Sequence, residues 1–200
     1  MKHLATVLYE DRAADDRNFA LHRLVVRCVH DTLLERAVSL DFGELHRDGL
    51  RGIPRNSNTK VRAACLRDLR DLTVDGNHVV ALYDSDRVHD LVPTSGRCKR
   101  ELSLALREGC SPADRLRVVL LVRNTETLIA ALRHGPVEEL VGRDVFEKAL
   151  KKDRNARDIV LKAAAKEDLR AVREALRRAV SSLDYLAAKL VELVVPGLAP

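Results

Sequence analysis

Aromatic residues are scarce in this 200-residue chain, at 3%, and tryptophan is absent. The core must therefore be aliphatic, and few rings are available on which nucleic-acid bases could stack. The sequence has no glycine-rich phosphate loop of the Walker or dinucleotide-binding type, which argues against an autonomous ATPase or a dehydrogenase. No apolar run approaches the roughly 20 residues that a membrane-spanning helix requires, so we expect no membrane partner.

Disulfide and zinc patterns are also missing. The chain contains no C-x-x-C pair and no Cys/His spacing typical of a zinc site. Its first residues run directly into an apolar, strand-like segment rather than into a signal peptide. Together these features predict a cytoplasmic protein with reduced cysteines.

Length and charge set broad limits. Two hundred residues fit one domain with a small helical addition, and 46% hydrophobic residues are enough to form a core. The formal net charge is +5, from 35 basic and 30 acidic residues. This mild excess is compatible with nucleic-acid binding, but it is also common in other proteins.

Hydrophobic periodicity predicts alternating strands and helices. Strands are expected at residues 4–10, 78–83 and 117–122, with a weaker one at 37–42. Helices are expected at residues 19–34, 60–72, 99–108 and 125–133, and a basic loop at 49–58. Such alternation predicts an α/β fold with a mostly parallel sheet.

The residue pattern changes after Gly135-Pro136, because the segment that follows consists mainly of helix-forming residues and has no strand-like run. The sequence therefore predicts an α/β domain over residues 1–135 and a helical C-terminal region over 136–200. Residues 166–194 carry an apolar stripe at helical spacing. We expect this helix to pack on its own domain, while a homodimer or another protein partner remains an alternative.

Acidic residues follow three of the predicted strands. Glu10 follows the first, Asp84 and Asp86 follow the strand at 78–83, and Glu126 comes just past the last. The carboxyl ends of parallel strands form one edge of a sheet, where ligands bind. Crowded carboxylates repel each other unless a cation or a proton relieves them, and Mg²⁺ prefers such oxygen ligands. Acids in these positions can also cap the next helix, for example one beginning near Arg87.

Three short motifs resemble those of Toprim domains, and most closely those of the uncharacterised Toprim-like DUF4276 group. They are Tyr9-Glu10-Asp11-Arg12, Asp84-Ser85-Asp86 and Arg123-Asn124-Thr125-Glu126. The resemblance covers about residues 4–133, and it implies a Toprim-like, Rossmann-like topology.

The resemblance also implies a function, a Mg²⁺- or Mn²⁺-dependent nuclease or a related phosphoryl-transfer enzyme. Asp84 and Asp86 would hold the metal. Glu10 would be a second ligand or the general base, and Glu126 a further ligand. Arg123, Arg87 and Arg12 would meet phosphate or the charge that develops in the transition state.

Nucleic acid is the expected partner. Arg51, Arg55 and Lys60 make residues 49–60 the most basic loop of the first half of the chain. The alternative is a non-catalytic module that keeps the fold and binds nucleic acid or a protein partner. A phosphatase-like hydrolase acting on a small phosphorylated molecule is a third, weaker interpretation.

Overall fold

The computed structural model describes residues 4–10, 21–121 and 181–197. Its sheet contains four strands: β1 (Ala5–Tyr9), β2 (Leu50–Pro54), β3 (His78–Asp84) and β4 (Leu116–Leu121). The strand order is β2-β1-β3-β4, and every neighbouring pair is parallel. The α/β fold with a parallel sheet, expected from the sequence, is confirmed.

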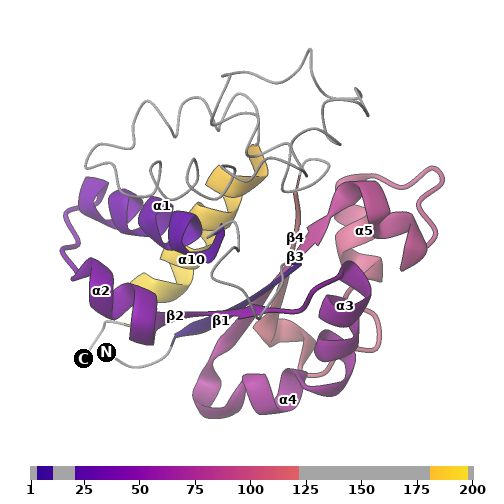
Figure 1. Cartoon of the computed structure of the whole chain (residues 1–200), viewed down its shortest axis with the longest axis horizontal. Coiled ribbons are helices and arrows are strands. Elements are labelled where there is room, and N and C mark those ends of the chain that lie inside the picture. The colour runs from indigo at the N-terminus through magenta and orange to yellow at the C-terminus, as the bar shows by residue number, and fades with distance from the viewer. Residues whose placement is uncertain (1–3, 11–20, 122–180, 198–200) are drawn as a thin grey trace.

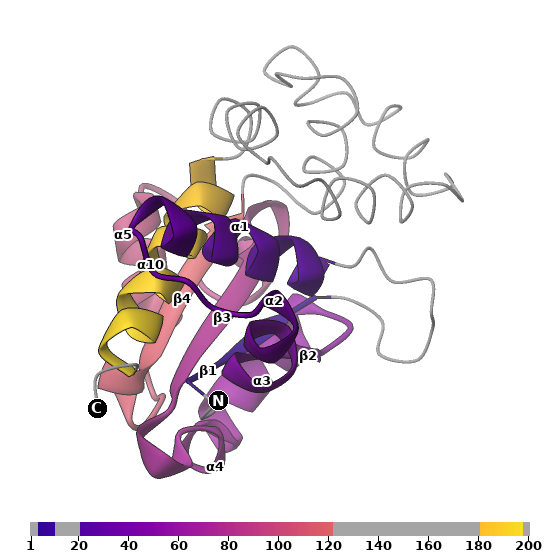
Figure 2. The same cartoon turned by 90° about the vertical axis from the view of Figure 1, so that its left-hand side faces the viewer.

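Helices cover both faces of this sheet (Figure 1, Figure 2). One face carries α1 (Leu21–Glu35) and α10 (Ser181–Gly197), which pack against each other. The other carries α3 (Asn58–Arg67), α4 (Leu69–Leu72) and α5 (Lys99–Ala105). The shorter helical turns are α2 (Phe42–Glu44), a π-helical turn at Leu45–Gly49, and 3-10 turns at Val74–Gly76, Ser85–Asp90 and Ala113–Arg115.

The core consists of aliphatic side chains on both faces of the sheet. Ala81 and Tyr83 of β3 belong to a buried cluster with Val61 of α3. Side chains alternate along a strand, so Val80 and Leu82, both buried, face α1 and α10 instead. The sheet is thus buried on both sides, which explains why its strands read as continuous apolar runs.

Helix α10 packs on the sheet unit of its own chain. It contacts α1 and β4, and its Leu186, Leu190 and Val194 are fully buried. The described C-terminal part of the apolar stripe therefore packs within its own chain. The predicted helix at 125–133 and residues 136–180 lie outside the described residues.

Two expectations at the sheet's β2 side are wrong. Residues 50–54, expected to be loop, form strand β2. Residues 37–42, expected to be a weak strand, instead contain the turn after α1, a segment without regular structure and the first residue of α2. Ala37 has a φ of 58°, so the chain reverses there. Gly52 and Pro54 conceal β2 in the sequence because both residues weaken a strand pattern. Pro54 is tolerated because it ends an outer strand of the sheet.

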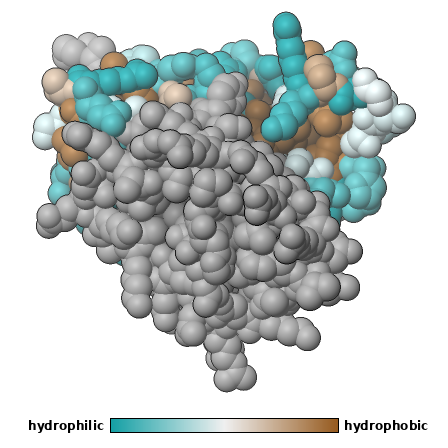
Figure 3. All heavy atoms as spheres, turned by 90° about the horizontal axis from the view of Figure 1, so that it is seen from above, coloured by the Kyte–Doolittle hydropathy of each residue, from teal (hydrophilic) through white to brown (hydrophobic). Residues whose placement is uncertain are grey.

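Figure 3 shows how side chains are distributed on the upper face. Hydrophilic side chains cover most of the described surface, and hydrophobic ones gather on the right, where Figure 1 draws α3 and α5. Leu66 of α3 and Leu104 of α5 are both about half exposed. None of the described helices is long and apolar enough to cross a bilayer.

Candidate functional site

The strand order reverses between β1 and β3. The chain passes from β1 through α1 to β2 on one side, then through α3 and α4 to β3 on the other side of β1. In open α/β sheets, ligands bind outside the carboxyl ends of the strands where the order reverses. The candidate site of this fold is therefore the edge formed by the ends of β1 and β3.

Acidic residues occupy this edge. The β1–β3 register pairs Leu8 with Ala81, so Glu10 and Asp84 leave neighbouring strands at nearly the same level. Asp84 is only 9% exposed. One carboxylate oxygen of Glu10 and one of Asp86 are shielded from solvent. Buried carboxylates cost free energy unless hydrogen bonds or a cation offset their charge.

Asn58 fixes the main chain of Asp84. The buried Asn58 side chain donates from Nδ2 to the Asp84 carbonyl at 2.9 Å and accepts from the Asp84 amide at 3.1 Å. Asn58 is the first residue of α3, whose start is capped by Ser57 through the Lys60 amide at 3.2 Å. This two-bond clamp connects the first acid of the D-x-D motif rigidly to the neighbouring helix.

Helix capping does not account for Asp84. A 3-10 turn begins at Ser85, directly after it, yet the Asp84 side chain makes no capping hydrogen bond to that turn. Asp86 lies within the first residues of the turn rather than before it. The alternative in which Asp84 serves only as a helix cap is therefore not supported by the geometry.

The donor set fits Mg²⁺ in its chemistry but is not a complete cage. Within residues 4–10, 21–121 and 181–197, no three His, Cys, Asp or Glu side chains lie close enough to hold an ion together. Mg²⁺ is commonly held by one or two carboxylates, with water and substrate phosphate completing its shell. Asp84 and Asp86 fit that role, with Glu10 on the neighbouring strand. Glu126, the fourth expected ligand, lies outside the described residues.

The structure describes four of the predicted phosphate-binding residues and places them in different parts of the fold. Arg55 follows β2 at the same edge, where its amide donates to the Tyr9 carbonyl at 2.9 Å and its Nη2 lies 3.7 Å from Asp68. Arg87 and Lys60 are exposed, Arg87 in the turn after β3 and Lys60 in the first turn of α3.

Arg51 is not brought to this edge. It pairs with Thr6, three residues before the end of β1, which corresponds to about 10 Å along the strand. The expectation that Arg51 lies with the other phosphate-binding residues is therefore not supported. Arg12 and Arg123 lie outside the described residues.

Sequence reasoning missed a histidine beneath the end of β1. The ring of His22 is stacked with that of Tyr9, with centroids 6.5 Å apart, and its Nε2 donates to the Leu50 carbonyl at 2.6 Å. Burial lowers the pKa of His22 to about 4, so the ring is neutral. His46, with its ring centroid 4.9 Å away, also has a pKa lowered by burial and then by nearby arginines.

This histidine pair supports the strand end rather than forming a metal site. The nitrogen of His22 that bonds Leu50 is committed to a main-chain carbonyl. A Cβ added at Gly52 would lie 2.5 Å from the His22 ring, so glycine is required for the ring to lie against β2. In the sequence, the only indication that another group packs closely against this strand is Gly52 itself.

Comparison with known protein families, curated proteins and solved structures found no match to this chain. Function must therefore be argued from the geometry of this edge.

Proposed function

We propose that this protein is a Mg²⁺-dependent phosphoryl-transfer enzyme of Toprim type that cleaves phosphodiester bonds. One observation carries the proposal, the presence of acids at the ends of β1 and β3, where the strand order reverses. Binding sites of open α/β sheets occur at this point. The motifs that resemble Toprim domains fall on the same residues, Glu10 and the Asp84-Ser85-Asp86 segment.

Each residue has a distinct role in this proposal. Asp84 and Asp86 hold the metal, which when bound polarises the phosphate and neutralises its developing charge. Glu10 accepts the proton of the attacking water or adds an oxygen to the metal shell. Arg55 and Arg87 bind the substrate phosphate. Asn58 keeps Asp84 in position, so that little reorganisation is needed when the substrate arrives.

The alternative function is a non-catalytic module that keeps the fold and binds nucleic acid or a protein partner. In such a module the acids need no ion, and replacing one of them relieves repulsion. Metal binding therefore separates the two functions directly.

The first test is thermal unfolding with Mg²⁺, Mn²⁺ or EDTA. A ligand that binds only the folded state stabilises it by about 2.7 kcal/mol at 100 times its dissociation constant. For a chain of this length, that corresponds to a rise in Tm of about 5–10 °C. We expect this rise in the wild type and in Asp71→Asn, a control at an exposed acid of α4, and its loss in Asp84→Asn and Asp86→Asn.

The second test is cleavage of an end-labelled single-stranded oligonucleotide with Mn²⁺. We expect products with the wild type and the Asp71→Asn control and at least a 100-fold loss with Asp84→Asn, as is typical when a group that stabilises the transition state is removed. Metal-independent melting together with an absence of cleavage would reject the enzyme and favour the binding module.

A further inference from the structure

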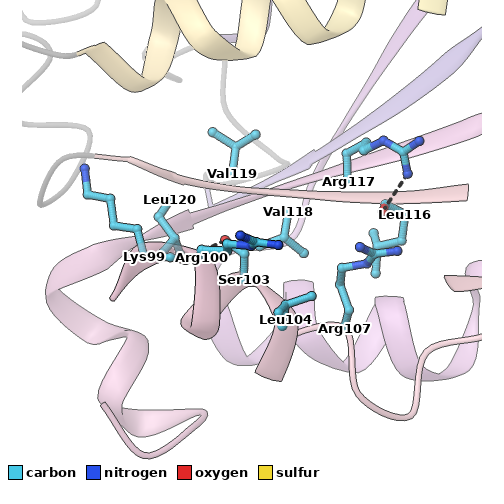
Figure 4. Close-up of a pocket in the computed structure, with 10 residues that line it drawn as sticks. All are labelled: Lys99, Arg100, Ser103, Leu104, Arg107, Leu116, Arg117, Val118, Val119 and Leu120. Carbon is cyan, nitrogen blue, oxygen red and sulfur yellow. Dashed lines mark hydrogen bonds between the residues drawn. The ribbon is translucent and has the colours of Figure 1, made fainter. Parts of the chain in front are cut away.

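A basic pocket lies outside the acidic edge, between β4 and α5. Its volume is about 710 Å³ (Figure 4). Leu116, Val118 and Leu120 supply its strand wall. Three basic side chains, those of Lys99, Arg100 and Arg107, lie on its α5 side, Arg117 points to the opposite side of β4 (Figure 4), and none of the described lining residues is acidic. No sequence motif pointed to these four residues as a group.

The described lining residues of the pocket extend along β4. Figure 4 shows Lys99 beside Leu120 at one end and Arg107 beside Leu116 at the other. The β3–β4 register pairs Leu120 with Tyr83, the residue before Asp84. The Lys99 end of this groove therefore lies level with the D-x-D motif. Four strand steps from Leu116 to Leu120 span about 13 Å.

Main-chain carbonyls orient two of the arginines without cancelling their charge. Arg107 donates from Nη2 to the Ala113 carbonyl at 2.6 Å, and Arg117 donates from Nη1 to the Asp114 carbonyl at 2.7 Å. The Nε of Arg107 is shielded from solvent and has no hydrogen-bond partner among the described residues. These guanidinium groups are thus held in place with their charge available to an anion.

The nearest acid of α5 does not neutralise the Lys99 end. Glu101 is engaged by its own helix, where its carboxylate accepts from the Cys98 amide at 2.9 Å. Lys99 and Arg100 are exposed. The groove therefore keeps an excess of positive charge along its whole length.

We propose that this groove binds a single strand of nucleic acid through its phosphates and leads that strand to the acids at the end of β3. The inference rests on the proposed function and identifies its substrate as a polynucleotide rather than a small phosphate. A length of about 13 Å exceeds the spacing of successive phosphates, so several can be bound in a row. Leu116 and Leu120 are buried in the core, so Val118, which is partly buried, is the residue of this wall that can contact a sugar.

Two features favour a nucleic-acid strand over an acidic peptide. Arginine fits phosphate oxygens with paired hydrogen bonds, and main-chain carbonyls hold Arg107 and Arg117 in place at the Leu116 end of the pocket. The groove also ends level with Asp84, at the edge where phosphodiester chemistry is proposed. None of its described lining residues is aromatic, so bases are not stacked and binding is independent of sequence.

The test measures binding of a fluorescein-labelled 12-nucleotide oligothymidylate by anisotropy in EDTA and low salt. We expect Lys99→Glu/Arg100→Glu to weaken binding at least about tenfold, with a salt dependence shallower by about 0.7 per lost phosphate contact. Both residues lie in the first turn of α5, where acids suit the helix dipole, so the variant should fold. The neutral pair Lys99→Gln/Arg100→Gln provides the same test with a smaller change in charge.

The matched control is Arg36→Glu/Arg70→Glu, which reverses two exposed arginines at the end of α1 and in α4. It changes the net charge equally and should weaken binding less than about threefold. Equal losses in the two charge-reversal variants would overturn the groove. Equal competition by polyglutamate of the same charge would also overturn it, because the groove would then not distinguish a nucleic-acid strand from an acidic peptide.

Working in EDTA separates this inference from the proposed function. Asp84→Asn should bind the oligonucleotide at least as tightly as the wild type, because it removes a negative charge near the end of the groove. If the groove variants weaken binding but no metal-dependent cleavage is found, the groove is retained as a binding site and the enzyme proposal is rejected. Cleavage unaffected by Lys99→Glu/Arg100→Glu would keep the enzyme and reject the groove.

Discussion

Replacing Asn58 tests whether α3 holds the first acid of the D-x-D motif. Asn58→Ala removes both hydrogen bonds between the Asn58 side chain and the buried main chain of Asp84. Removing one partner of a buried hydrogen bond costs about 1–3 kcal/mol. We therefore expect a loss of about 3 kcal/mol in the free energy of unfolding, measured by urea denaturation followed by circular dichroism.

Ser57→Ala is the matched control for this experiment. It removes the cap of the same helix, a loss of about 1 kcal/mol, and leaves the Asp84 clamp intact. Asn58→Asp is a second variant, in which one carboxylate oxygen still accepts from the Asp84 amide while the other faces the Asp84 carbonyl. Its repulsion should make it as unstable as Asn58→Ala. An Asn58→Ala protein no less stable than Ser57→Ala would refute the clamp.

Three further predictions concern the packing that supports the site. In the unfolded chain His22 binds a proton below pH 6.5, whereas in the folded protein its pKa is lowered to about 4. The free energy of unfolding should therefore fall by roughly 3 kcal/mol between pH 6.5 and pH 4. His22→Gln should flatten that part of the urea-denaturation pH profile. Gly52→Ala should cost about 1–3 kcal/mol because its methyl group meets the His22 ring, which thermal unfolding will measure. Leu190→Ala should cost about 2–5 kcal/mol if α10 is part of the core, whereas Val195→Ala, at a 40% exposed position, should change stability by less than about 0.5 kcal/mol.

The elements that were predicted well are those whose signal is local. The segments predicted at 4–10, 78–83 and 117–122 are continuous apolar runs, and strands β1, β3 and β4 lie on their described residues. Helix α1 follows the helical spacing of its apolar residues. The acids that end β1 and β3 were placed correctly because parallel strands share one carboxyl edge.

The features that were missed depend on contacts between distant residues. Strand β2 contains a glycine and a proline, and its glycine makes sense only when His22, 30 residues earlier, packs against it. Asn58 reads as an ordinary helix-start residue until β3 places the Asp84 main chain beside it. The basic groove is formed by side chains of α5 and β4, and the basic residues of these two elements form no recognisable sequence motif. Tertiary packing, rather than local propensity, decides each of these cases.

The connection that reverses the strand order also immobilises the acid. The chain must leave β2, cross β1 and return as β3, and α3 is the first helix of that crossover. A right-handed crossover brings α3 under the ends of β1 and β3, on the face opposite α1. Its first residue, Asn58, then meets Asp84 as β3 ends. Thus one connection produces both the reversal of the strand order and the fixed main chain of Asp84. A variant that loosens the start of α3 should therefore disturb the site before it disturbs the sheet.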